Sequence, residues 1–252
     1  MRRLAVLVAF GLMASTRTAL AYRPFDGTDA DVAKRGELEL EIGTVGYLHG
    51  RDGTAVAPVQ VVNFGPTDRV EFVLAGRPFV PAYGAAGERF ALVDTEASIK
   101  GVLREGVLQG RRGPSIALEL GALLPTLNGE PGWGAAAALI VSERVSFLTL
   151  HLNVQATRTR AANADGIVDL IAEGPPIFAR TRPVAELSLE HEFGVTRTAA
   201  ALVGLISQVS ERFALDGAAR FAASGRDHVL EIRGGFTWDI DLLGAAEPHR
   251  DE

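Results

Sequence analysis

From position 37 onward, polar and apolar residues alternate along most of the chain. Residues 36–43 read GELELEIG, so three glutamates alternate with Leu38, Leu40 and Ile42. Successive side chains of an extended strand point to opposite faces. The same alternation recurs at 68–77, 93–104, 115–124, 147–157, 182–192 and 229–239. A sustained period of two predicts strands with one wet face and one apolar face.

The pattern predicts twelve strands, many of them 10–13 residues long. Strands of soluble proteins usually have about five or six residues, whereas a strand that crosses a bilayer needs about 9–11. We therefore expect an all-β fold, an antiparallel transmembrane β-barrel of about 12 strands that follows a cleaved signal peptide. The expected strands are 37–48, 54–64, 69–79, 92–104, 114–124, 133–142, 145–158, 166–173, 182–193, 197–208, 212–222 and 227–240.

The connections between these strands alternate in character. Short polar turns that end in Arg join even-numbered strands to the next strand, as in VSERV (141–145), VSERF (209–213) and GPTDRV (65–70). Connections at the other end are longer and rich in Gly, Asn and Pro, at 81–91, 125–132 and 158–166. Short turns at one end and long loops at the other are typical of outer-membrane barrels. The segments 105–113 and 174–181 depart from this pattern.

Three predicted strands give weak face assignments. Strand 133–142 is apolar on both faces, 197–208 is ambiguous, and 54–64 contains Pro58.

Aromatic residues make up only 7% of the chain, although outer-membrane barrels usually carry aromatic girdles. The aromatics that are present lie mostly near predicted strand ends, where interface anchors belong: Tyr47, Phe64, Phe79, Trp133, Phe147, Phe193, Phe213 and Trp238.

The N-terminus resembles a secretory signal. A basic start, Arg2-Arg3, precedes the apolar run LAVLVAFGLMA, and small residues before Tyr22 predict cleavage after Ala21. We expect residues 1–21 to be the signal peptide, 22–36 a polar leader, 37–240 the barrel and 241–252 a polar tail. After the signal there is no run of about 18 apolar residues, so the sequence predicts no transmembrane helix.

Charge and composition restrict the partners. The chain has no cysteine and a net charge of −6, and removal of the signal leaves 22 basic against 31 acidic residues. An acidic protein of this kind is a poor nucleic-acid ligand. The expected partners are the lipid bilayer of the outer membrane, the outer-membrane assembly machinery and a small-molecule solute of unknown identity.

The polar faces of the strands define the residues expected to line the lumen. Acidic residues outnumber basic ones among them, so an open lumen should favour cations or neutral polar solutes. The basic members offer partners for salt bridges across the lumen. The predicted lumen-lining residues are Glu37, Glu39, Glu41, Glu71, Arg77, Asp94, Glu96, Lys100, Arg104, Glu119, His151, Asn153, Gln155, Glu186, Glu190, Glu192, Arg220, Glu231 and Arg233.

The last strand carries a second kind of signal. The segment from Arg233 to Ile240 reads RGGFTWDI. It resembles the C-terminal recognition pattern of bacterial outer-membrane barrels, with Gly235, Trp238 and Ile240 in the characteristic places. These three residues are the predicted assembly signal, although the tail LLGAAEPHRDE extends beyond the strand.

The whole mature chain resembles a group of uncharacterised proteobacterial outer-membrane barrels described as transporters. The stretches that carry the resemblance are RPFDGTDADVA, GELELEIGTVGY and GPSIALELGALLPTLNGEPGWG. They are similar in character to barrels attached to phenol-degradation clusters. The resemblance implies a fold and an outer-membrane location, and it hints at a small hydrophobic solute.

Motifs for catalysis or cofactors are weak. The pair His191-Glu192 lacks the second histidine of a zinc helix, and GWGAAA (132–137) follows a turn, not the strand that a dinucleotide site needs. Asp26, Asp29 and Asp31 lack the ligand order of a calcium loop, so we expect them to solvate the leader. No cofactor and no metal site are predicted.

His151 supports the one enzymatic alternative, a lipid hydrolase. Such a site needs a serine within hydrogen-bond reach of the base and an acid to orient it. Ser142, Ser188 and Ser207 lie on predicted strands, but spacing alone brings none of them to His151. The row Thr149-His151-Asn153-Gln155 fits the wall of a water-filled lumen better.

The sequence therefore favours an outer-membrane barrel without enzymatic activity, a passive channel or transporter for small solutes that are polar, cationic or hydrophobic. Two alternatives stay open. One is a soluble periplasmic β-barrel that binds a ligand, and the other is the lipid hydrolase centred on His151.

Overall fold

The computed structural model describes residues 23–50, 53–83, 90–128, 130–178 and 180–243. The predicted signal peptide and residues 244–252 of the predicted tail lie outside this part of the chain. No helix among the described residues is long and apolar enough to cross a bilayer.

Thirteen strands and one short 3-10 helix are present in the described part of the chain. Most strands begin and end within three residues of their predicted bounds. In chain order they are β1 (Glu37–Gly50), β2 (Gly53–Val56), β3 (Gln60–Thr67), β4 (Val70–Tyr83), β5 (Ala91–Arg104), η1 (Val107–Gln109), β6 (Ser115–Leu123), β7 (Gly134–Val145), β8 (Leu148–Arg158), β9 (Ala164–Glu173), β10 (Thr181–Glu192), β11 (Thr196–Ser210), β12 (Phe213–Ser224) and β13 (Asp227–Asp241).

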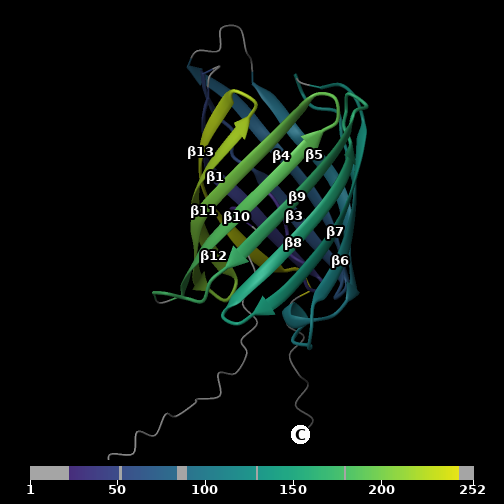
Figure 1. Cartoon of the computed structure of the whole chain (residues 1–252). Coiled ribbons are helices and arrows are strands. Elements are labelled where there is room, and N and C mark those ends of the chain that lie inside the picture. The colour runs from purple at the N-terminus through teal and green to yellow at the C-terminus, as the bar shows by residue number, and fades with distance from the viewer. Residues whose placement is uncertain (1–22, 51–52, 84–89, 129, 179, 244–252) are drawn as a thin grey trace, which may run out of the picture.

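The strands form one closed antiparallel sheet (Figure 1). Each strand from β4 to β13 pairs with its neighbour in the sequence, and β13 pairs with β1 from Glu37↔Asp241 to Gly50↔Val229. β2 and β3 lie end to end between β1 and β4, so the barrel has twelve strand positions. The predicted twelve-stranded antiparallel barrel is confirmed. Closure removes the free edge strands that an open sheet would expose.

The prediction of one continuous strand over 54–64 is wrong. Residues 57–59 leave the sheet between β2 and β3, because Pro58 has no N–H for the ladder. The flanking backbone pairs irregularly with β1: the Ala57 N–H donates to Gly46 O at 2.6 Å, and the Gly43 N–H donates to Val59 O at 2.8 Å.

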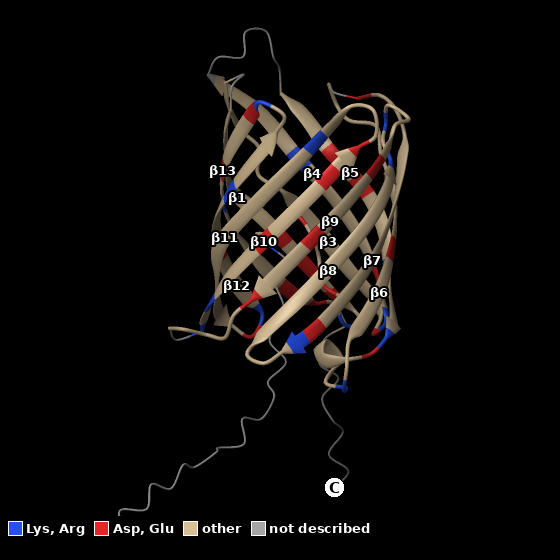
Figure 2. Ribbon diagram, viewed as in Figure 1, with Lys and Arg blue, Asp and Glu red and all other residues tan. Residues whose placement is uncertain are grey.

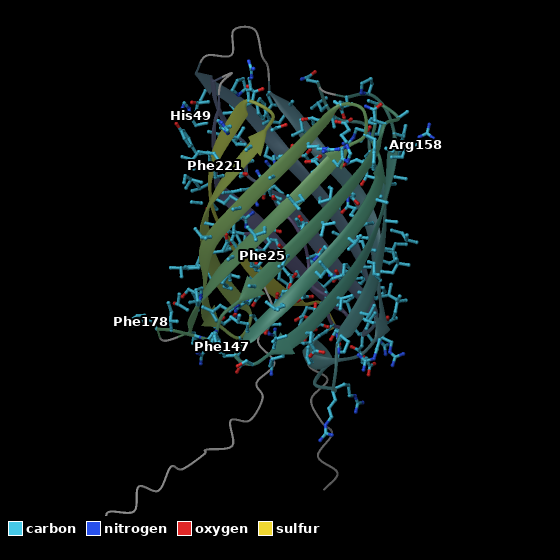
Figure 3. All side chains as sticks on the ribbon, viewed as in Figure 1. Phe25, His49, Phe147, Arg158, Phe178 and Phe221 are labelled. Carbon is cyan, nitrogen blue, oxygen red and sulfur yellow. The ribbon has the colours of Figure 1, made fainter. Side chains whose placement is uncertain are left out.

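The two faces of the wall differ sharply in exposure. On β10, Leu187 and Leu189 are 59% and 62% exposed, whereas Glu186 and Ser188 are 2% and 9% exposed. The same alternation of exposed aliphatic and buried polar residues runs along β4, β8 and β13. Acidic and basic residues of the wall lie on many strands (Figure 2), and side chains cover the inner and outer faces of the wall (Figure 3). An apolar outer face of this extent suits a lipid environment.

The start of β1 and the end of β13 are paired at one end of the barrel, which we call the terminal end (bottom in Figure 1). The two-residue connections 68–69, 146–147 and 211–212 lie there. The longer segments 105–114 and 174–180 lie there too, as the sequence suggested. The far end carries the longer connections 124–133 and 159–163, but also the short ones 193–195 and 225–226.

A first prediction tests the assignment of the outer face. Leu187→Arg, at the middle of β10, should lower the free energy of unfolding in phospholipid vesicles by about 2–4 kcal/mol, because the charge would enter hydrocarbon. Gln155→Arg, on the inner face of β8, is the matched control and should change it by less than about 1 kcal/mol. Urea titration followed by tryptophan fluorescence measures both, and equal losses would contradict the assignment.

Candidate functional site: a leader segment inside the barrel

Residues 23–36, which we call the leader, run through the barrel lumen. Ala30, Asp29 and Arg23 are 0%, 2% and 4% exposed, and Phe25 lies within the outline of the wall (Figure 3). The expectation that the leader aspartates serve solvation is therefore wrong for Asp29. The leader has no strand of its own, so its backbone groups need other partners.

Polar side chains of the wall supply the first of these partners. The carboxylate of Glu186 on β10 accepts two hydrogen bonds, from Asp26 N–H at 2.9 Å and Gly27 N–H at 2.8 Å. Asn153 on β8 makes a reciprocal pair with Thr28. Its Oδ1 accepts the Thr28 N–H at 2.9 Å, and its Nδ2 donates to Thr28 O at 2.7 Å. The two side chains thus supply the backbone of three consecutive leader residues with hydrogen-bond partners that a neighbouring strand would otherwise provide.

Further anchors follow along the leader. The Ala30 N–H donates to Ser142 Oγ on β7 at 3.0 Å, and the Ala33 N–H donates to Glu71 Oε2 on β4 at 2.7 Å. Gln109 of η1 donates to Ala30 O at 3.0 Å. Five leader N–H groups are therefore satisfied by side chains from four strands spread around the barrel.

Ion pairs fix the start of the leader. The Asp26 carboxylate receives Arg220 Nε from β12 and Arg233 Nη2 from β13, each at 2.6 Å. Arg233 also donates to Pro24 O at 2.7 Å. Burial alone would raise the pKa of Asp26, but Arg233 and Arg220 outweigh burial and hold this pKa below its ordinary value.

Arg23 lies beneath the pairing of the first and last strands. Its Nε contacts Asp216 on β12 at 3.2 Å, and its Nη1 donates to Val59 O at 3.0 Å. Gly43 of β1 and Gly235 of β13 face each other in the register beside it. A Cβ on Gly235 would lie 2.7 Å from Arg23 Nε, and one on Gly43 would lie 2.9 Å from Nη1. Gly235, predicted as part of the assembly signal, therefore also makes room for Arg23.

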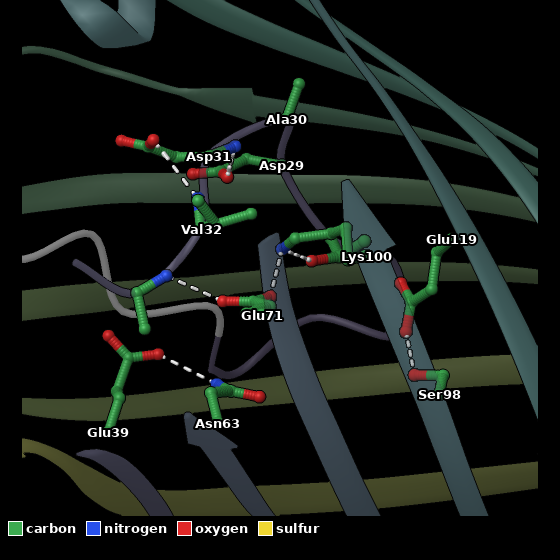
Figure 4. A network of polar contacts seen from close by, with 12 residues as sticks. Asp29, Ala30, Asp31, Val32, Glu39, Asn63, Glu71, Ser98, Lys100 and Glu119 are labelled. Atoms are coloured by element: carbon green, nitrogen blue, oxygen red, sulfur yellow. Dashed lines mark hydrogen bonds and ion pairs between the residues drawn. The ribbon is translucent and has the colours of Figure 1, made fainter. Parts of the chain in front are cut away.

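A second polar network supports the middle of the leader (Figure 4). Lys100 Nζ on β5 lies 2.7 Å from Glu71 Oε1, and it donates to Thr28 Oγ1 at 3.4 Å. Burial raises the pKa of Asp29 to about 7, although Lys100 and His151 act against this rise.

Apolar patches on the inner wall receive the apolar leader residues. Phe25 packs against Val184, Ile206 and Ala214. Ala30 packs in a cluster with Ala117, Ala138 and Ile140. These clusters explain why 133–142 and 197–208 gave weak face assignments, because the inner faces of β7 and β11 meet protein here and not water.

Several other predicted lumen residues pair with the wall itself. Asn63 Nδ2 donates to both Glu39 and Glu41 at 2.9 Å, and Ser98 Oγ donates to Glu119. Glu231 contacts Arg77 at 3.5 Å and Arg233 at 2.8 Å. Glu192 accepts from Asn163 at 2.8 Å, and Gln155 donates to Thr157 Oγ1 at 3.0 Å. Glu96 and Glu190 are half-buried.

The remaining predicted residues lie toward the strand ends. Glu37 contacts Lys34 at 3.6 Å. The Asp94 side chain is 66% exposed and lies 3.4 Å from Arg77, at a residue with φ of 51°. Arg104 donates to the carbonyls of Arg112 and Pro114 in the connection before β6. Trp238 is 48% exposed on the outer face, and Ile240 is half-buried.

Ser142 and His151 meet, which the spacing of the sequence did not suggest. Ser142 Oγ lies 2.8 Å from His151 Nδ1, and His151 Nε2 lies 3.7 Å from Glu173 Oε1. The register could have predicted the first contact, because Ser142 and His151 are directly paired across the β7–β8 turn. Arg182 contacts Glu173 from the other side at 2.8 Å.

The geometry of this trio suits an anchor better than a nucleophile. Ser142 and His151 are 0% and 1% exposed. Ser142 Oγ accepts the Ala30 N–H, so the leader backbone occupies the side from which an acyl group would have to approach. The Ser142 O–H can then donate to His151 Nδ1, and in that tautomer the ring N–H lies on Nε2, toward Glu173.

Comparison with known proteins identifies the fold. No family model and no curated protein matches the chain. An outer-membrane channel from Pseudomonas putida F1 aligns with 86% of this chain and 100% of its own, at 10% identity and a TM-score of 0.57. The NanC porin and a KdgM porin in complex with oligogalacturonate each align with 79% of this chain and 98% of their own. Their identities are 7% and 9%, and their TM-scores are 0.56 and 0.53. The predicted resemblance to outer-membrane transport barrels is confirmed at the level of the fold.

A second prediction tests how the leader is held. Glu186→Ala removes the acceptor of two N–H groups, and each buried N–H left unpaired costs about 1–3 kcal/mol. Amide hydrogen exchange at Asp26 and Gly27 should therefore speed up by about tenfold or more, as read by mass spectrometry.

Glu190→Ala is the matched control for this prediction. Glu190 lies on the same strand and face, and no hydrogen bond joins it to the leader in the described structure. Its substitution should leave exchange at residues 26–28 unchanged. Equal exchange rates in the two variants would show that Glu186 does not hold the leader.

Proposed function

We propose that the protein is a passive outer-membrane channel or transporter for small solutes. The observation that carries this proposal is a closed twelve-stranded wall that is apolar outside and polar inside. Three channels and porins of known structure share this fold. The terminal end, which carries the two-residue turns, then faces the periplasm, because the periplasmic turns of outer-membrane barrels are short. The C-terminal residues Trp238 and Ile240 then take part in recognition by the assembly machinery.

A soluble periplasmic barrel is the weaker alternative. Exposed aliphatic and aromatic residues cover the outside of β4, β8, β10 and β11, including Phe72, Leu152, Leu189 and Val203. Soluble monomers rarely expose apolar patches larger than a few hundred Å². A bilayer covers such a surface without any further partner.

The leader restricts what can pass. It occupies the lumen between Arg23 near β12 and Ala33 near β4, so the passage is narrow in this conformation. The acidic excess of the inner wall favours cations over anions, because low-dielectric walls strengthen the field of the lining charges. The proposed solutes are therefore small, and neutral or cationic.

The lipid-hydrolase alternative rests on the contact between Ser142 and His151. We favour a positioning role in which both residues hold Ala30, for the geometric reasons given above. The function that we propose is therefore not enzymatic and needs no cofactor.

Reconstitution into planar bilayers tests the proposal. We expect small conductance steps with a cation preference that shrinks as salt rises, since the screening length falls from about 10 Å at 0.1 M to about 3 Å at 1 M. Glu190→Gln with Glu192→Gln should lower the preference, and Glu211→Gln in the exposed β11–β12 turn should not. Anion preference would contradict the charge argument. Absence of conductance together with loss of lipid hydrolysis in His151→Ala would favour the enzyme.

A further inference from the structure

A cavity of about 230 Å³ lies between the leader and the inner wall. Leader residues 23–28 form one side of it, and inward residues of the barrel form the rest. An apolar cavity of about 150 Å³ admits a benzene molecule. This cavity therefore has room for one aromatic ring with a short substituent.

Small residues on neighbouring strands create this space. Gly121 of β6 and Ala136 and Ala138 of β7 line the cavity where longer side chains would fill it. A Cβ on Gly121 would collide with the carboxylate of Glu96, which extends across this glycine. With Phe25 and the valines at positions 59, 61 and 73, these residues form an apolar wall.

The charged groups of the cavity are unbalanced. Six carboxylates and three cationic side chains line it. The cations are already engaged: Arg23 with Asp216, Lys100 with Glu71, and Arg233 with Asp26 and Glu231. Carboxylates that are buried without a counter-ion are costly, so the arrangement favours a cationic ligand.

Four of the six carboxylates have no ion pair among the described residues, and two of these, Glu41 and Glu119, accept hydrogen bonds from Asn63 and Ser98. The other two, Glu96 and Asp169, are the candidates for binding such a ligand. No ion pair joins Glu96 or Asp169 to a basic side chain anywhere in the described chain. Arg160 and Arg220, whose charges act on Glu96 and Asp169, have other partners: Arg160 donates to Leu124 O and Thr95 O, and Arg220 contacts Asp26. Asp169 is 5% exposed, and its Oδ1 has no hydrogen-bond partner among the described residues.

We propose that this cavity binds a small organic cation, a protonated amine that carries an apolar body about the size of one ring. The ammonium group, with three N–H donors, would lie among Glu96 and Asp169, and the ring would lie against Phe25, Ala136 and Ala138. The proposal narrows the solute class of the proposed channel and rests on that function for its biological meaning. Binding itself can be measured without transport.

Calorimetric titration of the full mature chain in detergent micelles tests the site near neutral pH. The probes are benzylammonium, benzyl alcohol and benzoate, which share a ring and differ in charge. We expect benzylammonium to bind at least tenfold more tightly than benzyl alcohol, and benzoate not to bind. Equal binding of all three, tighter binding of benzoate, or binding of none would overturn the proposal.

Variants separate charge from shape in this test. Asp169→Asn with Glu96→Gln should weaken benzylammonium binding at least tenfold. Ala136→Leu should abolish it by filling the cavity without a change of charge, and Glu211→Gln, outside the cavity, should leave it unchanged. Heat-modifiable gel mobility checks that each variant folds. Unchanged affinity in the folded double variant would refute the site. A wild type that binds the amine but shows no conductance would refute the channel and leave the site standing.

Discussion

The hydrogen bonds between the leader and the inner wall determine much of the interior of this protein. A chain segment inside a closed barrel has no free strand edge to pair with, so its buried N–H groups must find side-chain acceptors. Glu186, Asn153, Ser142 and Glu71 are these acceptors, and they come from β10, β8, β7 and β4. Their positions fix the path of the leader across the lumen.

Other features of the wall follow from that path. The inner faces of β7 and β11 are apolar where they receive Ala30 and Phe25. Gly43 and Gly235 are small where Arg23 passes beneath the pairing of β1 and β13. Ser142 and His151 lie side by side because they are paired in the register of the β7–β8 hairpin. Ser142 accepts the Ala30 N–H from this position. The path of the leader thus explains the polar, apolar and glycine positions of the inner wall. The cavity is the space that remains between the leader and this wall.

Much of the barrel could be predicted from the sequence, because the alternation of residues such as Glu186, Leu187, Ser188 and Leu189 reports directly on two different environments. The break near Pro58 was visible as an irregularity, although its effect on pairing was not. The leader was missed because its sequence, YRPFDGTDADVAKRG, has the composition of a solvated loop. Only the three-dimensional structure shows that the wall supplies its hydrogen bonds.

The candidate site was predictable only in part, for the same reason. Glu186, Asn153 and Glu71 were recognised as inward residues from the period of two, but their partner could not be inferred from the period. Ser142 and His151 could have been paired by counting outward from the turn at 146–147. The roles of Gly121 and Ala136 had no signal in the sequence, because a small residue on an inner face can mark a cavity, a close approach or nothing.

Disulfide cross-linking tests the position of the leader most directly, because the chain has no native cysteine. Ala30 packs with the inward Ala138, whereas Ala137, the next residue on β7, is exposed on the outer face. The pair Ala30→Cys with Ala138→Cys should cross-link efficiently under mild oxidation in the folded protein, and the pair Ala30→Cys with Ala137→Cys should not. Failure of the first pair, or equal yields from the two, would contradict a leader that lies inside the barrel.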